Sequence, residues 1–261
     1  MRRLLIATLT LVLLGSAAAY AVVTTGGPGP DTIFGTAAAD TLNGLGGNDK
    51  ISGLGNKDNI HGGSGADRIF GDGTCPSSDA YYDAYYYCLG SVQAADRLVG
   101  GSGNDNISGN GGGDTVYAMA DNDRVHGGSG NDRLFGGTGN DSVIGDTGKD
   151  RLSGQAGNDT LSGEQSADTL AGGSGKDKVT GGPGNDKLTG GSGVDRLTGA
   201  KGNDRLSPSG GKDRVTAGSG RDRVSARDHR RDTINCGPGF DRVTADRIDK
   251  VSRNCERVSR R

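Results

Sequence analysis

Large side chains that normally build a globular core are scarce in this chain. Of its 261 residues, none is Trp and only four are Phe, whereas 51 are Gly. Because buried area in ordinary domains comes mainly from aromatic and large aliphatic side chains, a conventional globular core is excluded. The glycines do not recur at every third position, which also excludes a collagen helix. Such a chain is either disordered or built from a short repeat.

Long hydrophobic runs are also absent, except at the N-terminus. Residues 1–21, MRRLLIATLTLVLLGSAAAYA, combine a basic start, an apolar run from Leu4 to Leu14 and several alanines. This plan is typical of a secretory signal peptide, and the run is too short for a membrane-spanning helix. We expect cleavage after Ala19 or Ala21 and a secreted or cell-surface protein. An uncleaved anchor is the alternative interpretation.

Motifs for catalysis are missing as well. The sequence has no HExxH motif, and the GGSG serines lack the final glycine of a GxSxG elbow. The three histidines, His61, His126 and His229, are scattered along the chain. We therefore expect that the protein is not an enzyme.

What the sequence does contain is a repeat of nine residues. Aspartate occupies positions 31, 40, 49, 58 and 67, then position 96 and every ninth position through 222. The single gap, between Asp67 and Asp96, spans 29 residues, which is nine plus an insertion of 20. An aliphatic residue stands two positions after each of these aspartates, from Ile33 to Val224. Twenty agreements at both positions establish the period.

One unit is interpreted as a turn followed by a short strand. In GGSGND (127–132) the glycines permit left-handed backbone angles, and the Asn-Asp pair suits a turn. The following RLF (133–135) alternates polar and apolar residues, which predicts a three-residue strand with its middle side chain pointing inward. Two units then form one coil of 18 residues, and twenty units form about ten coils. Strands of units two apart stack in parallel, ~4.8 Å apart.

The units resemble the GGxGxDxUx nonapeptide of the RTX (hemolysin-type calcium-binding) proteins. GGPGPDTIF (26–34), GGSGADRIF (62–70) and GGPGNDKLT (181–189) match this pattern at every fixed position. The resemblance implies an all-β fold, a right-handed parallel β-roll with calcium ions held in the Gly/Asp turns. Calcium prefers about six to eight oxygen ligands, including carboxylate and backbone carbonyl oxygens, and such turns supply both.

The resemblance also implies which residues bind calcium. The candidate metal ligands are Asp31, Asp49, Asp67, Asp96, Asp105, Asp114, Asp132, Asp141, Asp150, Asp159, Asp177, Asp186, Asp195, Asp204 and Asp213. Since alternate units lie on the same side, the ions should form two stripes, one that includes Asp105, Asp123 and Asp141 and one that includes Asp96, Asp114 and Asp132. The alternative is a metal-free solenoid in which Asp merely suits the turn, although stacked like charges would then repel one another.

Several units depart from the pattern. The turns before Asp58, Asp123 and Asp168 lack the fourth-position glycine, which makes calcium binding by these three residues less secure. A cation directly precedes other aspartates and could compete with calcium; these cations are Lys57, Lys149, Lys176, Lys212 and Arg221. We expect calcium occupancy to decline toward the C-terminus.

Calcium is also expected to drive folding. The buried aliphatic residues of so glycine-rich a chain contribute less free energy than the ordering of its backbone costs. Metal binding would then supply the missing free energy of folding.

Five segments are predicted: the signal peptide (1–21), a first repeat block (26–71), an insertion (72–94), the main array (95–225) and a degenerate C-terminal cap (226–261). The insertion contains CPSSDAYYDAYYYC (75–88), with five of the seven tyrosines between Cys75 and Cys88. In a secreted protein these cysteines suggest one disulfide, and Cys236 with Cys255 a second. The tyrosines either contact a sugar or protein partner or pack against the roll.

The charge pattern leaves two interpretations open. The formal net charge is −2, or −4 without Arg2 and Arg3, and Lys or Arg follows the aspartate in most units. Bound calcium would therefore make the roll cationic. Its basic strand faces are either merely solvated or bind an anionic cell-envelope polymer, a glycan or a protein. We expect a calcium-binding scaffold or, alternatively, an adhesin, with no nucleic-acid partner and no membrane span in the mature chain.

Overall fold

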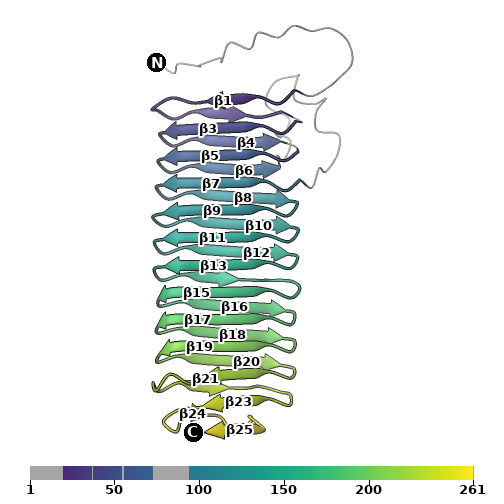
Figure 1. The fold of residues 1–261 in the computed structure, drawn as a ribbon, viewed down its shortest axis with the longest axis vertical. Helices are drawn as coiled ribbons and strands as arrows, with labels where there is room; N and C mark the ends of the chain where they lie inside the picture. Colours follow the sequence, from purple (N-terminus) through teal and green to yellow (C-terminus); the bar gives the residue numbers. More distant parts are fainter. Residues whose placement is uncertain (1–19, 37, 55, 73–93, 261) are drawn as a thin grey trace.

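The chain forms one parallel β-solenoid. The computed structural model describes residues 20–36, 38–54, 56–72 and 94–260. These ranges contain 25 strands, two per turn, in a solenoid of about twelve turns (Figure 1). The predicted all-β parallel roll is therefore confirmed. Most of the predicted signal peptide and of the insertion lies outside the described residues.

Two parallel sheets form the two sides of the solenoid. The 13-stranded sheet contains, in order, β1 (Val23–Thr25), β3 (Thr41–Gly46), β5 (Asn59–Ser64), β7 (Arg97–Ser102), β9 (Thr115–Ala120), β11 (Arg133–Thr138), β13 (Arg151–Ala156), β15 (Thr169–Gly175), β17 (Lys187–Gly193), β19 (Arg205–Gly211), β21 (Arg223–Ala226), β23 (Arg242–Ala245) and β25 (Arg257–Arg260). The 12-stranded sheet contains β2 (Thr32–Phe34), β4 (Lys50–Leu54), β6 (Arg68–Asp72), β8 (Asn106–Gly111), β10 (Arg124–Ser129), β12 (Ser142–Thr147), β14 (Thr160–Ser162), β16 (Lys178–Pro183), β18 (Arg196–Lys201), β20 (Arg214–Ser219), β22 (Thr233–Asn235) and β24 (Lys250–Val251).

Strand register follows the 18-residue coil. Leu134 of β11 lies opposite Val116 of β9 and Leu152 of β13. Across the insertion, Ile60 of β5 lies opposite Leu98 of β7, a separation of 38 residues, which is 18 plus 20. The insertion therefore leaves the register of the coils intact.

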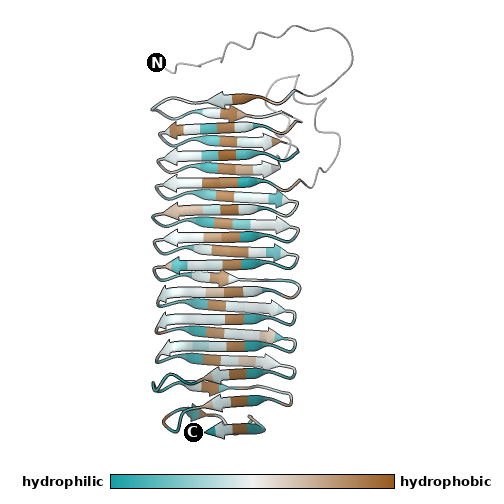
Figure 2. Ribbon diagram, in the orientation of Figure 1, coloured by the Kyte–Doolittle hydropathy of each residue, from teal (hydrophilic) through white to brown (hydrophobic). Residues whose placement is uncertain are grey.

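The core is a single row of aliphatic side chains on each sheet. We call the repeated aspartates, together with Asp232 and Asp241 of the C-terminal coils, the phased aspartates. The residue two positions after each phased aspartate is buried, as Leu134 is at 0% exposure. Figure 2 shows these residues as a brown band across the middle of the strands. Many strands are six or seven residues long because the pairing continues into the next unit, whose first residue is also buried. The prediction of three-residue strands was therefore too short for most coils.

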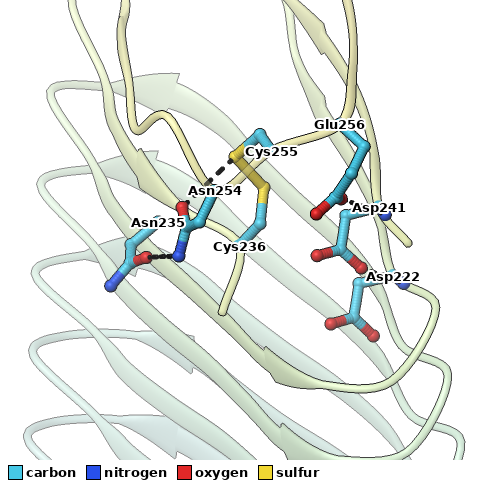
Figure 3. The surroundings of a disulfide bond; sticks show 7 residues. All are labelled: Asp222, Asn235, Cys236, Asp241, Asn254, Cys255 and Glu256. Carbon is cyan, nitrogen blue, oxygen red and sulfur yellow. Dashed lines mark hydrogen bonds between the residues drawn. A yellow bond between two sulfur atoms is a disulfide. The ribbon is translucent and has the colours of Figure 1, made fainter. Parts of the chain in front are cut away.

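The C-terminal coils absorb a change of spacing. β20 pairs with β22 at a separation of 19 residues, with Val215 opposite Ile234, and β21 pairs with β23 at the same separation. Beyond them the predicted disulfide between Cys236 and Cys255 is confirmed, with Cα atoms 5.3 Å apart (Figure 3). Cys75 and Cys88 lie outside the described residues. Across the described ranges, no helix has the length and apolar character needed to span a membrane.

Candidate metal centre

The phased aspartates form two columns, one along the turns that lead into each sheet. We name the columns after the strand numbers. The odd column precedes the odd-numbered strands of the 13-stranded sheet and includes Asp114, Asp132 and Asp150. The even column precedes the even-numbered strands of the 12-stranded sheet. From Asp40 to Asp241, the phased aspartates are at most 3% exposed. Asp31, at the start of the even column, is only half-buried. Every candidate ligand predicted from the sequence therefore belongs to one of these columns, and all but Asp31 are buried.

One oxygen of each carboxylate links successive coils. Oδ1 of Asp132 accepts the N–H of Asp114 at 2.7 Å, and the N–H of Asp132 donates to Oδ1 of Asp150 at 2.8 Å. The same bond connects the even column, where Asp123 donates to Asp141 at 2.9 Å. Each carboxylate thus reaches back to the preceding coil, and the bonds form a ladder along the solenoid axis.

The second oxygen of most of these carboxylates has no hydrogen-bond partner. Within the described part of the chain, a buried Oδ2 atom without a partner occurs in Asp49, Asp67, Asp105, Asp123, Asp132, Asp141, Asp150, Asp159, Asp168, Asp177, Asp186, Asp195, Asp204, Asp213, Asp222, Asp232 and Asp241. A buried carboxylate oxygen without a partner is costly, so it indicates a missing ligand. Asp31 and Asp40 differ, because their Oδ2 atoms accept the N–H groups of Gly27 and Thr36.

The free oxygen faces a carbonyl oxygen of the next coil across a small space. A Cβ atom built on Gly127 would lie 2.4 Å from Oδ2 of Asp132 and 2.8 Å from the carbonyl oxygen of Gly145. In the even column, a Cβ atom on Gly136 would lie 2.4 Å from Oδ2 of Asp141 and 2.9 Å from the carbonyl oxygen of Gly154. Glycine at the first position of the unit therefore keeps open a place where a carboxylate and a carbonyl oxygen converge.

The other two glycines of the motif have a different role. Gly128 and Gly130, at the second and fourth positions, adopt φ angles of 99° and 136°. Such angles are unfavourable for residues with a Cβ atom. In the turns that lack the fourth-position glycine, Asp121 and Ser166 nevertheless adopt φ angles of 78° and 87°. The backbone of these turns is therefore preserved.

Burial raises the pKa of these carboxyl groups. Desolvation, opposed by the backbone hydrogen bond from the preceding coil, raises the pKa of Asp132 to about 6 and that of Asp105 to about 7. The pKa of Asp123 rises to about 8, for the same reason and because of the neighbouring carboxylates in its column. Without a cation, the ionised form of both columns is therefore disfavoured near neutral pH.

The lysine and arginine residues that precede some aspartates do not neutralise these columns. Lys149, Lys176 and Arg221 have exposed side chains, and none forms an ion pair with a described carboxylate. Their backbone N–H groups donate to the side-chain Oδ1 atoms of Asn131, Asn158 and Asn203 of the preceding coil, at 2.8 Å in each case. The structure thus gives no support to competition between these cations and calcium.

The donor set suits a hard cation. The described residues contain no group of three or more His, Cys, Asp or Glu side chains close enough to hold a metal. An ion in these columns would therefore need main-chain carbonyl oxygens beside the carboxylates. Calcium accepts this combination, whereas zinc selects nitrogen and sulfur ligands. The residues present fit calcium.

Some features of the columns were not predicted from the sequence. Ala118, Pro208 and Ala217 replace the first-position glycine before Asp123, Asp213 and Asp222, so a carbon atom occupies the place that glycine leaves open. This substitution was visible in the sequence but had no meaning without the geometry. The hydrogen-bond ladder also extends past the slipped spacing. The backbone N–H of Asp232 donates to Oδ1 of Asp249 at 2.9 Å. The backbone N–H of Asp241 donates to Oε2 of Glu256 at 2.8 Å, as Figure 3 shows.

The three histidines lie in separate places. Nε2 of His61 lies 3.3 Å from Nη1 of Arg97 on the 13-stranded sheet, and Nδ1 of His126 lies 3.3 Å from Oδ2 of Asp146 on the 12-stranded sheet. His229 follows β21, with its ring nitrogen 3.8 Å from Asp246. The histidines therefore do not assemble into a common site.

Comparisons with known proteins agree with this geometry. The family model described as RTX calcium-binding nonapeptide repeat, in four copies, matches residues 25–58, 52–73, 93–125, 108–143, 144–179, 171–206, 189–224 and 207–229. A comparison with curated proteins found no matching relative. The matched segments together make up well over half of the sequence, and their repeats coincide with the coils that form the two carboxylate columns. The chain therefore belongs to the RTX calcium-binding nonapeptide repeat family.

Proposed function

We propose that this protein binds calcium along the odd and even columns and that calcium binding folds the roll. The observation that supports this most directly is the buried, partnerless Oδ2 atom, which recurs in coil after coil beside a glycine carbonyl oxygen. Asp132 and Asp141, with the carbonyl groups of Gly145 and Gly154 in the next coil, would each hold an ion. When bound, calcium would neutralise the buried carboxylates and provide the partner that their Oδ2 atoms lack.

Calcium and folding are coupled because the columns are unfavourable without a cation. A buried carboxylate that ionises without a counter-charge destabilises the folded state. Since the sites consist of residues from successive coils, they do not exist in the unfolded chain. The free energy of calcium binding therefore contributes to the free energy of folding.

Occupancy should depend on the first position of each unit. Turns with glycine at this position, such as those of Asp132 and Asp141, leave room between the two oxygens. The turns of Asp123, Asp213 and Asp222 begin with Ala or Pro, which reduces this room. Two of these three turns lie near the C-terminus, so this rule refines the expected decline of occupancy.

Secretion would give this coupling a biological role. The N-terminal segment has the plan of a signal peptide, and the disulfide between Cys236 and Cys255 is stable only outside a reducing cytosol. The chain would leave a compartment with little free calcium unfolded and fold where calcium is plentiful. Calcium would then act as a compartment-specific folding trigger.

The test is a calcium titration of the mature protein, followed by far-ultraviolet circular dichroism at pH 8. We expect little β-structure in chelator and a cooperative gain with a midpoint of ~0.1–1 mM, as for extracellular calcium modules. Magnesium at the same concentrations should not replace calcium, because it demands a smaller octahedral site. An unchanged β-rich spectrum in chelator, with no metal retained, would refute calcium-coupled folding.

A further inference from the structure

The outer face of the 13-stranded sheet is strongly basic at its C-terminal end. Lys187, Arg205, Arg223, Arg242 and Arg257 occupy the first positions of β17, β19, β21, β23 and β25, and all five side chains are exposed. Each lies directly opposite the next in the strand register. We call these five residues the basic ladder. Its positive charges repeat once per strand, about every 4.8 Å.

A row of hydroxyl groups runs beside the basic ladder. Thr189, Ser207, Ser225 and Thr244 stand two residues after the first four cations, on the same outward face of their strands. The first four cations of the basic ladder and these four hydroxyl residues line a hollow on the surface of the sheet. The face thus offers a cation and a hydroxyl group on each of four successive strands.

An exposed aromatic ring adjoins this hollow. Phe240 is 47% exposed, and the guanidinium carbon of Arg257 lies 5.1 Å from the centroid of its ring. Phe240 lines a second hollow with Arg221, Arg223 and Arg242, so the two hollows share residues of the basic ladder. The other residue that lines this second hollow, Asp222, is only 1% exposed.

The surroundings contain little negative charge. None of the 13 strands of this sheet contains Asp or Glu, whereas the strands of the opposite sheet include Asp72 and Asp146. The one exposed carboxylate directly beside the ladder in sequence is Glu256, which accepts the N–H of Asp241 (Figure 3). On the opposite sheet the equivalent cations form a shorter run, Lys178, Arg196 and Arg214, interrupted at Thr160 and Thr233.

We propose that the basic ladder binds a linear acidic polysaccharide, with carboxylates along the cations and ring hydroxyl groups along the Ser/Thr row. A polyuronate with one carboxylate on each ring repeats its charge at about the strand spacing, ~4.8 Å. Phe240 provides an apolar ring face against which a sugar can pack. A single-stranded nucleic acid fits less well, because its binding sites stack successive bases on several aromatic rings, whereas the described residues that line the two hollows include one aromatic side chain, Phe240.

This inference rests on the proposed function in one respect, because the ladder exists only in the folded roll. Folding is therefore measured separately, by circular dichroism under each condition of the binding experiment. If the roll proves to fold without calcium, polysaccharide binding should persist in chelator. Failure of calcium-coupled folding and failure of polysaccharide binding are thus distinguishable.

The experiment measures binding of a galacturonate hexamer, too short to gel with calcium, by isothermal titration calorimetry at fixed free calcium and ionic strength. Two triple variants with equal loss of charge are compared, R205Q/R223Q/R242Q on the ladder and K178Q/R196Q/R214Q on the opposite sheet. Three exposed ion pairs contribute about tenfold to an affinity, so the first variant should weaken binding about tenfold and the second less than about threefold. F240A should weaken binding, and F34A, which removes an exposed ring from β2, should not.

Maltohexaose and a thymidylate hexamer serve as neutral and nucleic-acid probes. Both should bind at least about tenfold more weakly than the uronate hexamer. Equal losses in the two triple variants would indicate unspecific charge attraction and would overturn the proposal. No binding by the folded wild-type protein, or tighter binding of the thymidylate, would overturn it as well. If a triple variant fails to fold, R223Q and R214Q provide the same comparison with one charge each.

Discussion

The space between Oδ2 and the carbonyl oxygen can be tested by filling it. In G127A the new Cβ atom would lie 2.4 Å from Oδ2 of Asp132 and 2.8 Å from the carbonyl oxygen of Gly145. Both distances are too short, so either the carboxylate or the next coil must move. The carboxylate can retreat only by weakening its bond to the N–H of Asp114, now 2.7 Å long.

The expected cost follows from these contacts. Overpacking a tight site costs about 1–3 kcal/mol, and loss of a hydrogen bond to a charged group costs about 1.5–3 kcal/mol. The two costs do not add in full, because a carboxylate that retreats from the new Cβ atom relieves the overpacking while it weakens its hydrogen bond. We therefore expect the free energy of unfolding in saturating calcium to fall by about 2–3 kcal/mol. The calcium midpoint for folding should rise accordingly.

The matched control is G210A, whose new Cβ atom would have its nearest neighbour, the carbonyl oxygen of Gly191, at 3.7 Å. This variant should differ from wild type by less than about 0.5 kcal/mol. The assay is guanidinium unfolding in saturating calcium, with calcium titrations of both variants. Ala118 and Ala217 show that some turns accommodate a Cβ atom. Equal stability of G127A and G210A would show that the space beside Oδ2 of Asp132 has no structural importance.

Three further predictions follow from the columns and the cap. D141N, which keeps the shape of the side chain but removes its charge, should stabilise the roll in chelator and destabilise it in calcium, whereas E164Q, at an exposed site, should leave the stability unchanged in either buffer. Unfolding curves of both variants in the two buffers test this, and a loss of stability of D141N in chelator as well as in calcium would contradict a metal-related role. In chelator, β-structure should increase as the pH falls, because burial raises the folded-state pKa of Asp132, Asp105 and Asp123 to about 6–8. The stability that comes from protonating these carboxylates is complete below their ordinary pKa of 3.8 and is lost as the pH rises through 6–8, so identical spectra at pH 4.5 and pH 8 would contradict it. C236S/C255S should lower the free energy of unfolding by about 3 kcal/mol, because the bridge closes a loop of 19 residues, and this loss should match that caused by reductant in the wild-type protein.

The repeat made the fold predictable from the sequence. A nine-residue period with an aliphatic residue at a constant place fixes which side chains point inward, as at Leu134 and Val143. It also fixes which units pair, because strands two units apart share a sheet. The two columns follow from the same rule. Cys236 and Cys255 were predictable as a pair because cysteines of a secreted protein are expected to form disulfides.

The features that escaped prediction depend on contacts between coils. The carboxylate of Asp132 uses one oxygen for the preceding coil and leaves the other facing a carbonyl group of the next, a division that no spacing within one unit reveals. The asparagines showed a similar limit. Asn131 suggested only a turn, yet its side-chain oxygen accepts the backbone N–H of Lys149 in the following coil at 2.8 Å. Asp249 and Glu256 were missed because the nine-residue spacing fails before them.

The most direct test of calcium in the two columns is a crystal structure of the mature protein grown in calcium, with anomalous diffraction data to locate the ions. We expect two rows of anomalous peaks along the solenoid, beside the Oδ2 atoms of glycine-initiated turns such as those of Asp132 and Asp141, and weaker peaks beside Asp123, Asp213 and Asp222. Peaks confined to exposed carboxylates such as Asp146 and Glu164, or a folded roll with no peaks in either column, would contradict it.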